Sequence, residues 1–293
     1  DVIDPLISNK QACCISICTS YGAGADQIFL DSPKAEWLWE YAQDKDVLVH
    51  IHPPLVSIGA AAMQQYRLIE AVGRPFDTAL SAARMIYSGV FDRYPKLKVL
   101  FVHMGGALAP VICRLDWNWD LNYKGIQNPP IQKVDKNLRR PSEYFKSNIY
   151  VDTMGPSAIG LKAMIEMCGV DRVLFGTDFG PVPMSPKLHI DLVDDTIADA
   201  GDREKIFSTN TLALLRLAES APHLAPRAAQ PSSARPWEAC KVSQGQGGKQ
   251  LEHILGVIRS FRRCHRAKAW NRIAMLIRRN ELQSCRLAGC VFG

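Results

Sequence analysis

Residues 171–178 read Asp-Arg-Val-Leu-Phe-Gly-Thr-Asp, a short apolar run that ends at a turn and then a carboxylate, Asp178. An acid does not stabilise a buried strand, but the carboxyl ends of parallel strands are where α/β barrels place their chemistry. Two earlier apolar runs, residues 47–52 and 98–103, end on histidine. Three strand ends that offer two imidazoles and a carboxylate predict a metal site.

Apolar runs alternate with helical patterns through the first 220 residues. The runs predict five strands, at residues 12–19, 47–52, 98–103, 148–151 and 172–175. The patterns predict helices at residues 32–45, 64–72, 78–91, 106–119, 157–168, 186–200 and 203–218. This alternation predicts an α/β fold with a parallel sheet covered on both faces. Five strands are too few for a closed eight-stranded barrel, so the periodicity allows either an open sheet or the later part of a barrel.

The histidines at the strand ends are the candidate ligands. His50 and His52 are two residues apart, and alternate residues of a strand point to the same side. Two imidazoles side by side suit Zn²⁺ or a similar cation. His103 precedes glycines that let the backbone approach a ligand, and it is a candidate third ligand or general base. The alternative for His50 and His52 is a packed, hydrogen-bonded core histidine.

The net charge of +6 is divided unevenly along the chain. From residue 221 onward, 13 Lys and Arg stand against 3 Asp and Glu, a net of +10, which leaves −4 for residues 1–220. We therefore expect a domain at 1–220, a Pro-, Ser- and Gly-rich linker at 221–250 and a basic tail at 251–293. A basic amphipathic helix in the tail could bind RNA, an acidic membrane or a partner, and the alternative is a disordered or non-native extension. The tail indicates no clear nucleic-acid or membrane partner.

Bulk properties indicate a cytoplasmic protein. The apolar share of 47% is enough for a substantial core. The longest apolar runs stop short of the ~20 residues that span a bilayer, and no basic-then-apolar leader opens the chain. The nine cysteines include no Cys-x-x-Cys pair, which is typical of reduced thiols in the cytosol.

Four segments together resemble one known family: LVHIHPP, SGVFDRYPKLKVLFVHMGGALAPVICRLD, NIYVDT and DRVLFGTDFGPVP. They are similar to the amidohydrolase superfamily, and within it to the amidohydrolase-related branch of aminocarboxymuconate-semialdehyde and resorcylate-type decarboxylases. The similarity runs from about residue 10 to residue 217. It implies a (β/α)₈ TIM-type barrel with one catalytic divalent metal, commonly zinc or manganese, and a homodimer.

The resemblance also implies roles for single residues. His52 corresponds to the family's histidine ligand after the fifth strand, and Asp178 to the aspartate ligand after the eighth. His103 corresponds to the histidine after the sixth strand, which acts on the metal-bound water or the substrate. His50 matches no general ligand, and we expect it behind the ligands or facing the substrate. The arginine with which muconate-type enzymes bind the substrate carboxylate across a dimer interface falls here on Asn122.

The family's first strand carries a His-x-His or Glu-x-His motif with two metal ligands, and residues 1–45 contain no histidine. The match begins near the fourth strand, so we expect this chain to hold about strands 4–8 of the barrel, with exposed strand edges. His52 and Asp178 alone are fewer protein ligands than the three usual for catalytic zinc. We expect weak metal binding and little activity if the chain is complete as given, and a working enzyme if it is part of a longer one.

The activity implied by the resemblance is non-oxidative decarboxylation of a small unsaturated or aromatic carboxylic acid. Zinc is the first candidate metal and manganese the alternative. Metal-dependent hydrolysis of an amide, ester or lactone is the second hypothesis, because sister families use the same constellation for that reaction. An inactive truncated derivative or a scaffold protein is the third.

Overall fold

The computed structural model describes residues 3–9, 11–22, 27–124, 137–179 and 185–217. The chain divides into two units, Asp1–Arg216 and Leu217–Gly293. The described residues belong to the first unit, with the exception of Leu217. The linker predicted at 221–250 and the basic tail predicted at 251–293 lie outside the described residues.

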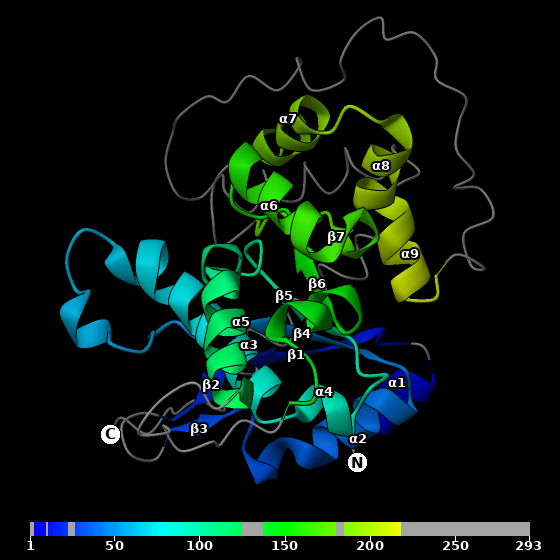
Figure 1. The fold of residues 1–293 in the computed structure, drawn as a ribbon. Helices are drawn as coiled ribbons and strands as arrows, with labels where there is room; N and C mark the ends of the chain where they lie inside the picture. The colour runs from blue at the N-terminus through cyan, green and yellow to red at the C-terminus, as the bar shows by residue number, and fades with distance from the viewer. Residues whose placement is uncertain (1–2, 10, 23–26, 125–136, 180–184, 218–293) are drawn as a thin grey trace, which may run out of the picture. The chain divides into compact units, whose positions relative to one another are not determined.

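A parallel sheet of five strands forms the centre of the first unit (Figure 1). The strands are β1 (Cys14–Cys18), β4 (Leu48–His52), β5 (Val99–Phe101), β6 (Ile149–Asp152) and β7 (Val173–Leu174). Their order in the sheet is their order along the chain, β1-β4-β5-β6-β7, and every neighbouring pair is parallel. The five strands and the parallel α/β arrangement predicted from the sequence are confirmed. In the described part of the chain no further strand pairs with β1 or β7, and the assignment of these strands to positions 4–8 of a barrel stays a prediction.

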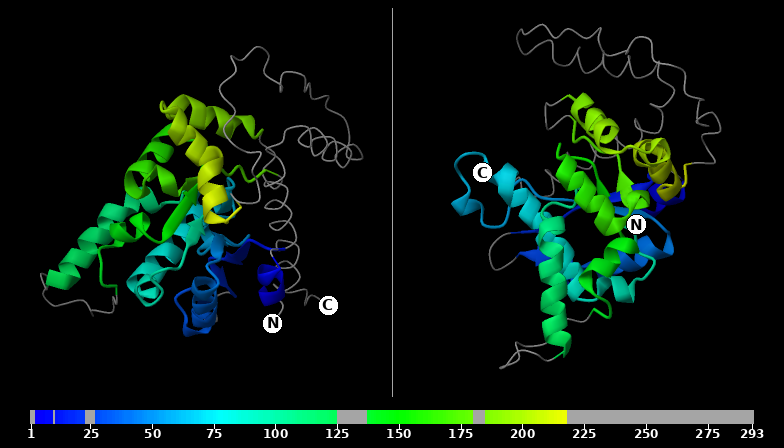
Figure 2. Two further views of the ribbon diagram at one scale, coloured as in Figure 1. Left: turned by 90° about the vertical axis from the view of Figure 1, so that its right-hand side faces the viewer. Right: turned by 45° about the horizontal axis from the view of Figure 1, so that its top comes forward.

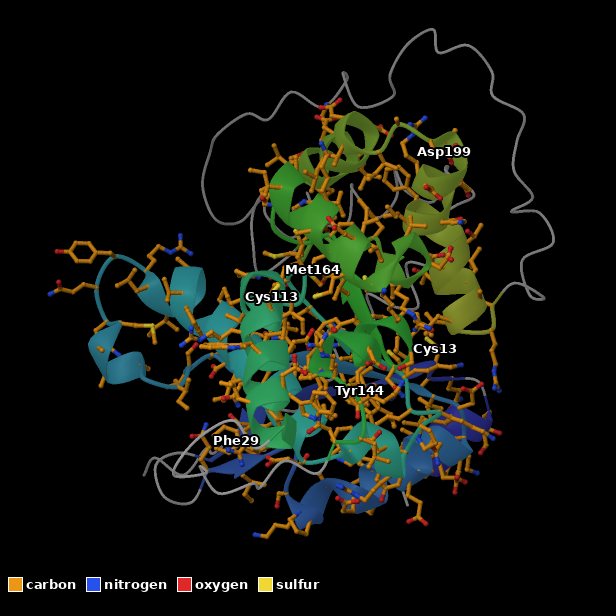
Figure 3. The ribbon with its side chains drawn as sticks, in the orientation of Figure 1. Cys13, Phe29, Cys113, Tyr144, Met164 and Asp199 are labelled. Atoms are coloured by element: carbon orange, nitrogen blue, oxygen red, sulfur yellow. The ribbon has the colours of Figure 1, made fainter. Side chains whose placement is uncertain are left out.

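One face of the sheet packs against the main core. Val49, Ile51, Phe101 and Val151 lie on this face, and none of their side chains is accessible to solvent. Large side chains from the surrounding elements complete this core, among them Tyr144, which is labelled in Figure 3. Because the strands are short and this face is wholly apolar, its burial supplies much of the driving force for folding.

The other face of the sheet carries both apolar and polar side chains. Leu48 and Leu174 form a second, smaller apolar cluster with Leu214. The same face also carries His50 and His52 in the carboxyl-terminal part of β4, and both are partly accessible. The prediction that both faces are covered therefore holds on this face where the second cluster lies.

Helices occupy the connections between the strands (Figures 1 and 2). Their bounds are α1 (Ile3–Ser8), α2 (Glu36–Asp44), α3 (Arg74–Tyr87), α4 (Val90–Arg93), α5 (Leu108–Lys124), α6 (Ala158–Cys168), α7 (Lys187–Thr196), α8 (Ala200–Glu204) and α9 (Asn210–Leu214). Two predicted starts are confirmed by their caps. The Ser157 hydroxyl accepts from Gly160 N at 3.0 Å before α6, and the Ser32 hydroxyl accepts from Lys34 N at 3.3 Å before a 3₁₀ turn that leads into α2.

The helix predicted at residues 64–72 is wrong at its start, because residues 64–67 are not helical. Tyr66 and Arg67 have φ angles of 58° and 56°, and two successive left-handed residues interrupt a right-handed helix. Only a π-helical turn, Ile69–Gly73, precedes α3, which begins at Arg74 rather than at residue 78.

Three further differences between the predicted and the observed elements lie near the two ends of the first unit. α7 ends at Thr196 rather than at residue 200, because Ile197 is extended and Asp199 caps α8 through its carboxylate. The helix predicted at 203–218 is α8 and α9 joined by a π-helical segment, Lys205–Thr209. A short antiparallel pair, β2 (Ser20–Tyr21) with β3 (Ile28–Phe29), was not predicted. No helix within the described ranges is both long and apolar enough to cross a membrane.

Candidate metal centre

Strand β4 brings two histidines to the same face of the sheet. Val49 and Ile51 turn into the core, so the alternate residues His50 and His52 turn to the other side. Their ring centroids lie 6.3 Å apart with an interplanar angle of 20°. The predicted common orientation of the two imidazoles is confirmed.

The hydrogen bonds of His52 prepare its second ring nitrogen for a ligand. Nδ1 lies 2.8 Å from the carbonyl oxygen of Pro53, and since a carbonyl only accepts, Nδ1 carries the proton. Nε2 then presents a lone pair, and this buried atom has no hydrogen-bond partner in the described part of the chain. Burial and the neighbouring His103 lower the pKa of His52 to about 4, so the ring is neutral at pH 7. A neutral imidazole with an unused buried lone pair is the form that binds a metal.

His103 lies in a strained turn beyond β5. The strand ends at Phe101, and four successive residues, His103 to Gly106, have φ angles of 59°, 52°, 70° and 63°. Glycine adopts this left-handed conformation readily, but each non-glycine residue there costs on the order of 1–3 kcal/mol. The helix predicted to open at the two glycines therefore begins only at Leu108. Such strain concentrates at functional sites.

A buried carboxylate, Asp152 at the end of β6, holds this turn in place. Its Oδ1 accepts from the backbone N–H of Met104 at 2.9 Å and of Met154 at 3.1 Å. Burial raises the pKa of Asp152 to about 6. Asp152 was not predicted from the sequence, although it also follows an apolar run as an acid, which was the signal that singled out Asp178.

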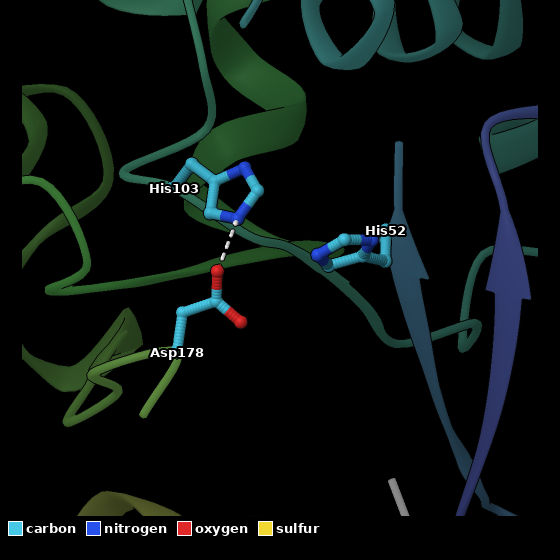
Figure 4. A group of neighbouring side chains, drawn as sticks. All are labelled: His52, His103 and Asp178. Atoms are coloured by element: carbon cyan, nitrogen blue, oxygen red, sulfur yellow. Dashed lines mark ion pairs between the residues drawn. The ribbon is translucent and has the colours of Figure 1, made fainter. Parts of the chain in front are cut away.

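Asp178 approaches the histidines from the segment after β7 (Figure 4). Its Oδ2 lies 3.8 Å from Nε2 of His103, and its own φ of 50° is again left-handed. Burial acts to raise the pKa of this carboxyl, but the nearby His103, together with His52 and Arg74, lowers the pKa below its ordinary value. Asp178 is therefore an anion at neutral pH.

His52, His103 and Asp178 each offer one ligand atom, and these three atoms lie within 4.8 Å of one another. Two nitrogens and one carboxylate oxygen fit a borderline divalent cation such as Zn²⁺, and also Mn²⁺. His103 thus lies where it could serve as a third donor or as a general base beside the metal, the two roles predicted for it. His50 does not join this group, and its Nδ1 lies 2.9 Å from the hydroxyl oxygen of Ser16 on β1.

A further buried histidine was not singled out from the sequence. His189 on α7 is 1% exposed, and neither ring nitrogen has a hydrogen-bond partner among the described residues. Burial lowers its pKa, and the charge of Asp178 partly opposes that shift. No sequence pattern distinguishes it from an ordinary core histidine. The side chain of Asn122 lies outside the described atoms.

Comparison with known proteins gives consistent results. A family model described as Amidohydrolase matches residues 26–217. A 2-amino-3-carboxymuconate-6-semialdehyde decarboxylase from Dictyostelium discoideum is 30% identical over 190 residues, which cover 64% of this chain and 50% of that protein. A gamma-resorcylate decarboxylase from Rhizobium radiobacter is 30% identical over 215 residues, which cover 67% of this chain and 58% of that protein. The chain thus spans between half and about three fifths of the length of these curated relatives.

A solved structure extends the similarity to the fold. The dihydroxybenzoic acid decarboxylase of Polaromonas sp. JS666, with bound manganese and the inhibitor 2-nitroresorcinol, aligns with a TM-score of 0.63 and 25% identity. The alignment covers 74% of this chain and 64% of that one. The family model matches more than half of the chain, in agreement with the motifs around the three site residues. The chain belongs to the amidohydrolase family.

Proposed function

We propose that the protein is a metal-dependent decarboxylase of a small aromatic or unsaturated carboxylic acid. The observation that carries the proposal is the convergence of the ligand atoms of His52, His103 and Asp178 within 4.8 Å, at and beyond the carboxyl ends of parallel strands. The relatives described above are decarboxylases of such acids, which supports this reaction over hydrolysis.

One divalent cation would be held by His52 and Asp178, with His103 beside it. An imidazole ligand suits zinc, whereas manganese is bound in the solved relative. When bound, the metal would supply a Lewis acid that draws electrons from oxygen atoms of the substrate. The unpartnered Nε2 of His52 supports this assignment, because a buried ring nitrogen without a partner costs free energy unless a ligand occupies it.

A residue of this chain can deliver the proton that replaces the carboxylate in the product. Non-oxidative decarboxylation adds one proton to the carbon that bears the carboxylate, the bond to the carboxylate breaks, and its electron pair passes to that carbon as CO₂ leaves. We assign delivery of this proton to His103, whose Nε2 is 3.8 Å from the carboxylate of Asp178. An anionic neighbour stabilises an imidazolium while it carries the proton.

His50 acts behind the ligands in this proposal. Its ring stacks near that of His52, and its Nδ1 is bound to the Ser16 hydroxyl. Burial, with the neighbouring His52 and His103, lowers its pKa to about 3, so it adds no positive charge beside the metal at neutral pH. We assign it to packing behind His52 and to lining the substrate side of the sheet.

Product analysis tests the reaction. The protein, loaded with Mn²⁺ or Zn²⁺, is incubated with gamma-resorcylate and other small aromatic and unsaturated acids in D₂O, and separately in H₂¹⁸O. We expect CO₂ release and one deuterium at the carbon that lost the carboxylate, without ¹⁸O in the organic product. Incorporation of ¹⁸O into an acid product would indicate hydrolysis instead, and no turnover of any acid with either metal would contradict the proposal.

A further inference from the structure

The amino end of α3 is fixed against the turn that carries His103. The carbonyl oxygen of Pro75 accepts from Ala107 N at 3.2 Å. A Cβ added at Gly106 would lie 2.4 Å from the same oxygen, so only glycine permits this approach. The first residues of α3 therefore keep a set position relative to the His103 turn.

The same helix end is fixed from its other side by the loop that follows His52. The Asp77 carboxylate accepts from Ile58 N at 3.1 and 3.3 Å through its two oxygens. A Cβ added at Gly73 would lie 2.7 Å from Cβ of Ser57, so this packing is also close. Arg74 stands between Gly73 and Pro75 in the sequence. It therefore lies between the loop that follows His52 and the turn that carries His103.

One donor of the Arg74 guanidinium is buried without a partner, although the residue as a whole is only half-buried. Its Nε is buried without a hydrogen-bond partner, and no ion pair to Arg74 occurs within the described residues. Residues 180–184, which follow the Asp178 segment, contain no acid that could pair with it. A buried charged donor without a partner costs at least the ~1–3 kcal/mol of a neutral one.

Most other described arginines form an ion pair, which Arg74 does not. Six of them pair with a carboxylate: Arg84, Arg93, Arg139, Arg140, Arg203 and Arg216. The positive charge of Arg74 instead acts on the candidate metal centre, where it contributes to the lowered pKa values of His52 and Asp178. A fixed cation beside a second cation is unfavourable unless an anion binds between or beside them.

We propose that Arg74 binds the carboxylate of the substrate at the metal centre and thereby selects anionic substrates. The assignment rests on the proposed decarboxylase function of this site. A guanidinium offers five donors in a planar fork that matches a carboxylate, and partial burial strengthens such a contact.

In this proposal Arg74 contacts the carboxylate of the bound substrate before the reaction begins. The negative charge of the carboxylate disappears as CO₂ forms, so the attraction to Arg74 weakens on the way to the products. Loss of the guanidinium is therefore expected to raise KM much more than it lowers kcat.

Binding of two matched probes tests the inference. Gamma-resorcylate carries a carboxylate, and resorcinol is the same molecule without it. Binding of each to the Mn²⁺-loaded protein is measured by calorimetry for the wild type, Arg74→Gln, Arg74→Lys and a control, Arg67→Gln, which changes an exposed arginine seven residues earlier. Metal content is measured for every variant, so that a lost metal is not mistaken for a lost contact.

We expect Arg74→Gln to weaken gamma-resorcylate binding by about 10- to 100-fold and to leave resorcinol unchanged, as for a charge-assisted hydrogen bond. Arg74→Lys should recover part of the loss, and Arg67→Gln should change neither probe. Equal effects on both probes, no effect of Arg74→Gln, or a wild type that binds neither probe would overturn the inference. Selective loss of carboxylate binding in a protein that decarboxylates no acid would instead refute the proposed function and leave the role of Arg74 standing.

Discussion

The two faces of the central sheet differ in chemistry although the same five short strands build both. On the helix-covered face, Val49, Ile51 and Phe101 are fully buried among apolar neighbours. On the opposite face, toward the carboxyl ends of the strands, His50 and His52 are partly buried among polar side chains. Because alternate residues of each strand face opposite sides, neighbouring positions in the sequence serve stability and chemistry in turn.

The difference between the two faces shows where the fold tolerates backbone strain. The His103 turn keeps two non-glycine residues in the left-handed conformation, at a cost of on the order of 1–3 kcal/mol each. The well-packed core on the other side of the sheet offsets such a cost. Substitutions on the two faces should therefore separate loss of function from loss of stability.

The largest expected effect concerns function alone. Asp178→Asn removes the anionic donor of the site but keeps its shape, so turnover should fall by more than the roughly 10–100-fold typical for loss of a group that only supports a ligand. The free energy of unfolding of the metal-free protein should change little. Steady-state assays and urea denaturation of the same preparations measure the two quantities. A variant with normal turnover would remove Asp178 from the mechanism.

A core substitution should show the converse. Phe101 is 0% exposed, and Phe101→Ala should lower the free energy of unfolding by about 3–5 kcal/mol through lost burial and a cavity. Ile159→Ala, at an 84% exposed position on α6, should change it by no more than about 0.5 kcal/mol. Urea denaturation compares both variants with the wild type. Similar losses for the two substitutions would contradict the division between core and surface.

The histidine face should make the metal-free protein sensitive to acid. Burial lowers the pKa of His50 to about 3 and of His52 to about 4, so between these values and 6.5 the unfolded chain binds more protons than the folded one. Stability should therefore be fully present above pH 6.5 and fall as the pH drops toward 4, on the order of 3 kcal/mol for each histidine.

Asp152 opposes this trend, because its raised pKa of about 6 favours the folded state at low pH and loses that contribution as the pH rises from 4 to 6. The two histidines have a larger combined effect than the one carboxyl, so the free energy of unfolding should still fall as the pH drops from 6.5 to 4. The double variant His50→Gln, His52→Gln should lose the acid sensitivity. Chemical denaturation from pH 4 to 7 measures it, and an unchanged slope in the double variant would show that other groups cause it.

The smallest expected effect concerns the hydrogen bond behind the ligands. Ser16→Ala removes the hydroxyl that lies 2.9 Å from Nδ1 of His50, and should cost about 1 kcal/mol of stability. Ser16→Thr keeps a hydroxyl and should preserve most of it. Thermal unfolding of the two variants is the measurement. If Ser16→Ala weakens metal binding as strongly as a ligand substitution does, His50 belongs among the ligands.

The sequence predicted those parts of the molecule that depend on local pattern. All five strands and the order of the main helices follow from apolar runs and from caps such as Ser32. The rule that strand ends carry chemistry also found His52, His103 and Asp178, whose ligand atoms converge in the structure. The same rule, applied to residue 152, would have found Asp152.

Features that depend on tertiary contact could not be predicted. The left-handed residues Tyr66 and Arg67 interrupt a segment whose composition favours a helix. Arg74 lies before the helix predicted at residues 78–91, and only the contacts of Pro75 and Asp77 in the structure place it near the site. Nothing in the local sequence distinguishes His189 from a packed core histidine.

The central claim is that His52 and Asp178 hold one divalent metal beside His103. The most direct measurement is titration of the metal-free protein with Zn²⁺ and Mn²⁺ in competition with a chromophoric chelator, for the wild type and for His52→Gln. We predict one site per chain in the wild type, and an affinity reduced at least about 100-fold in His52→Gln, since Nε2 of His52 is the buried nitrogen that lacks another partner. Absence of a site in the wild type, or equal affinity in the variant, would contradict the account.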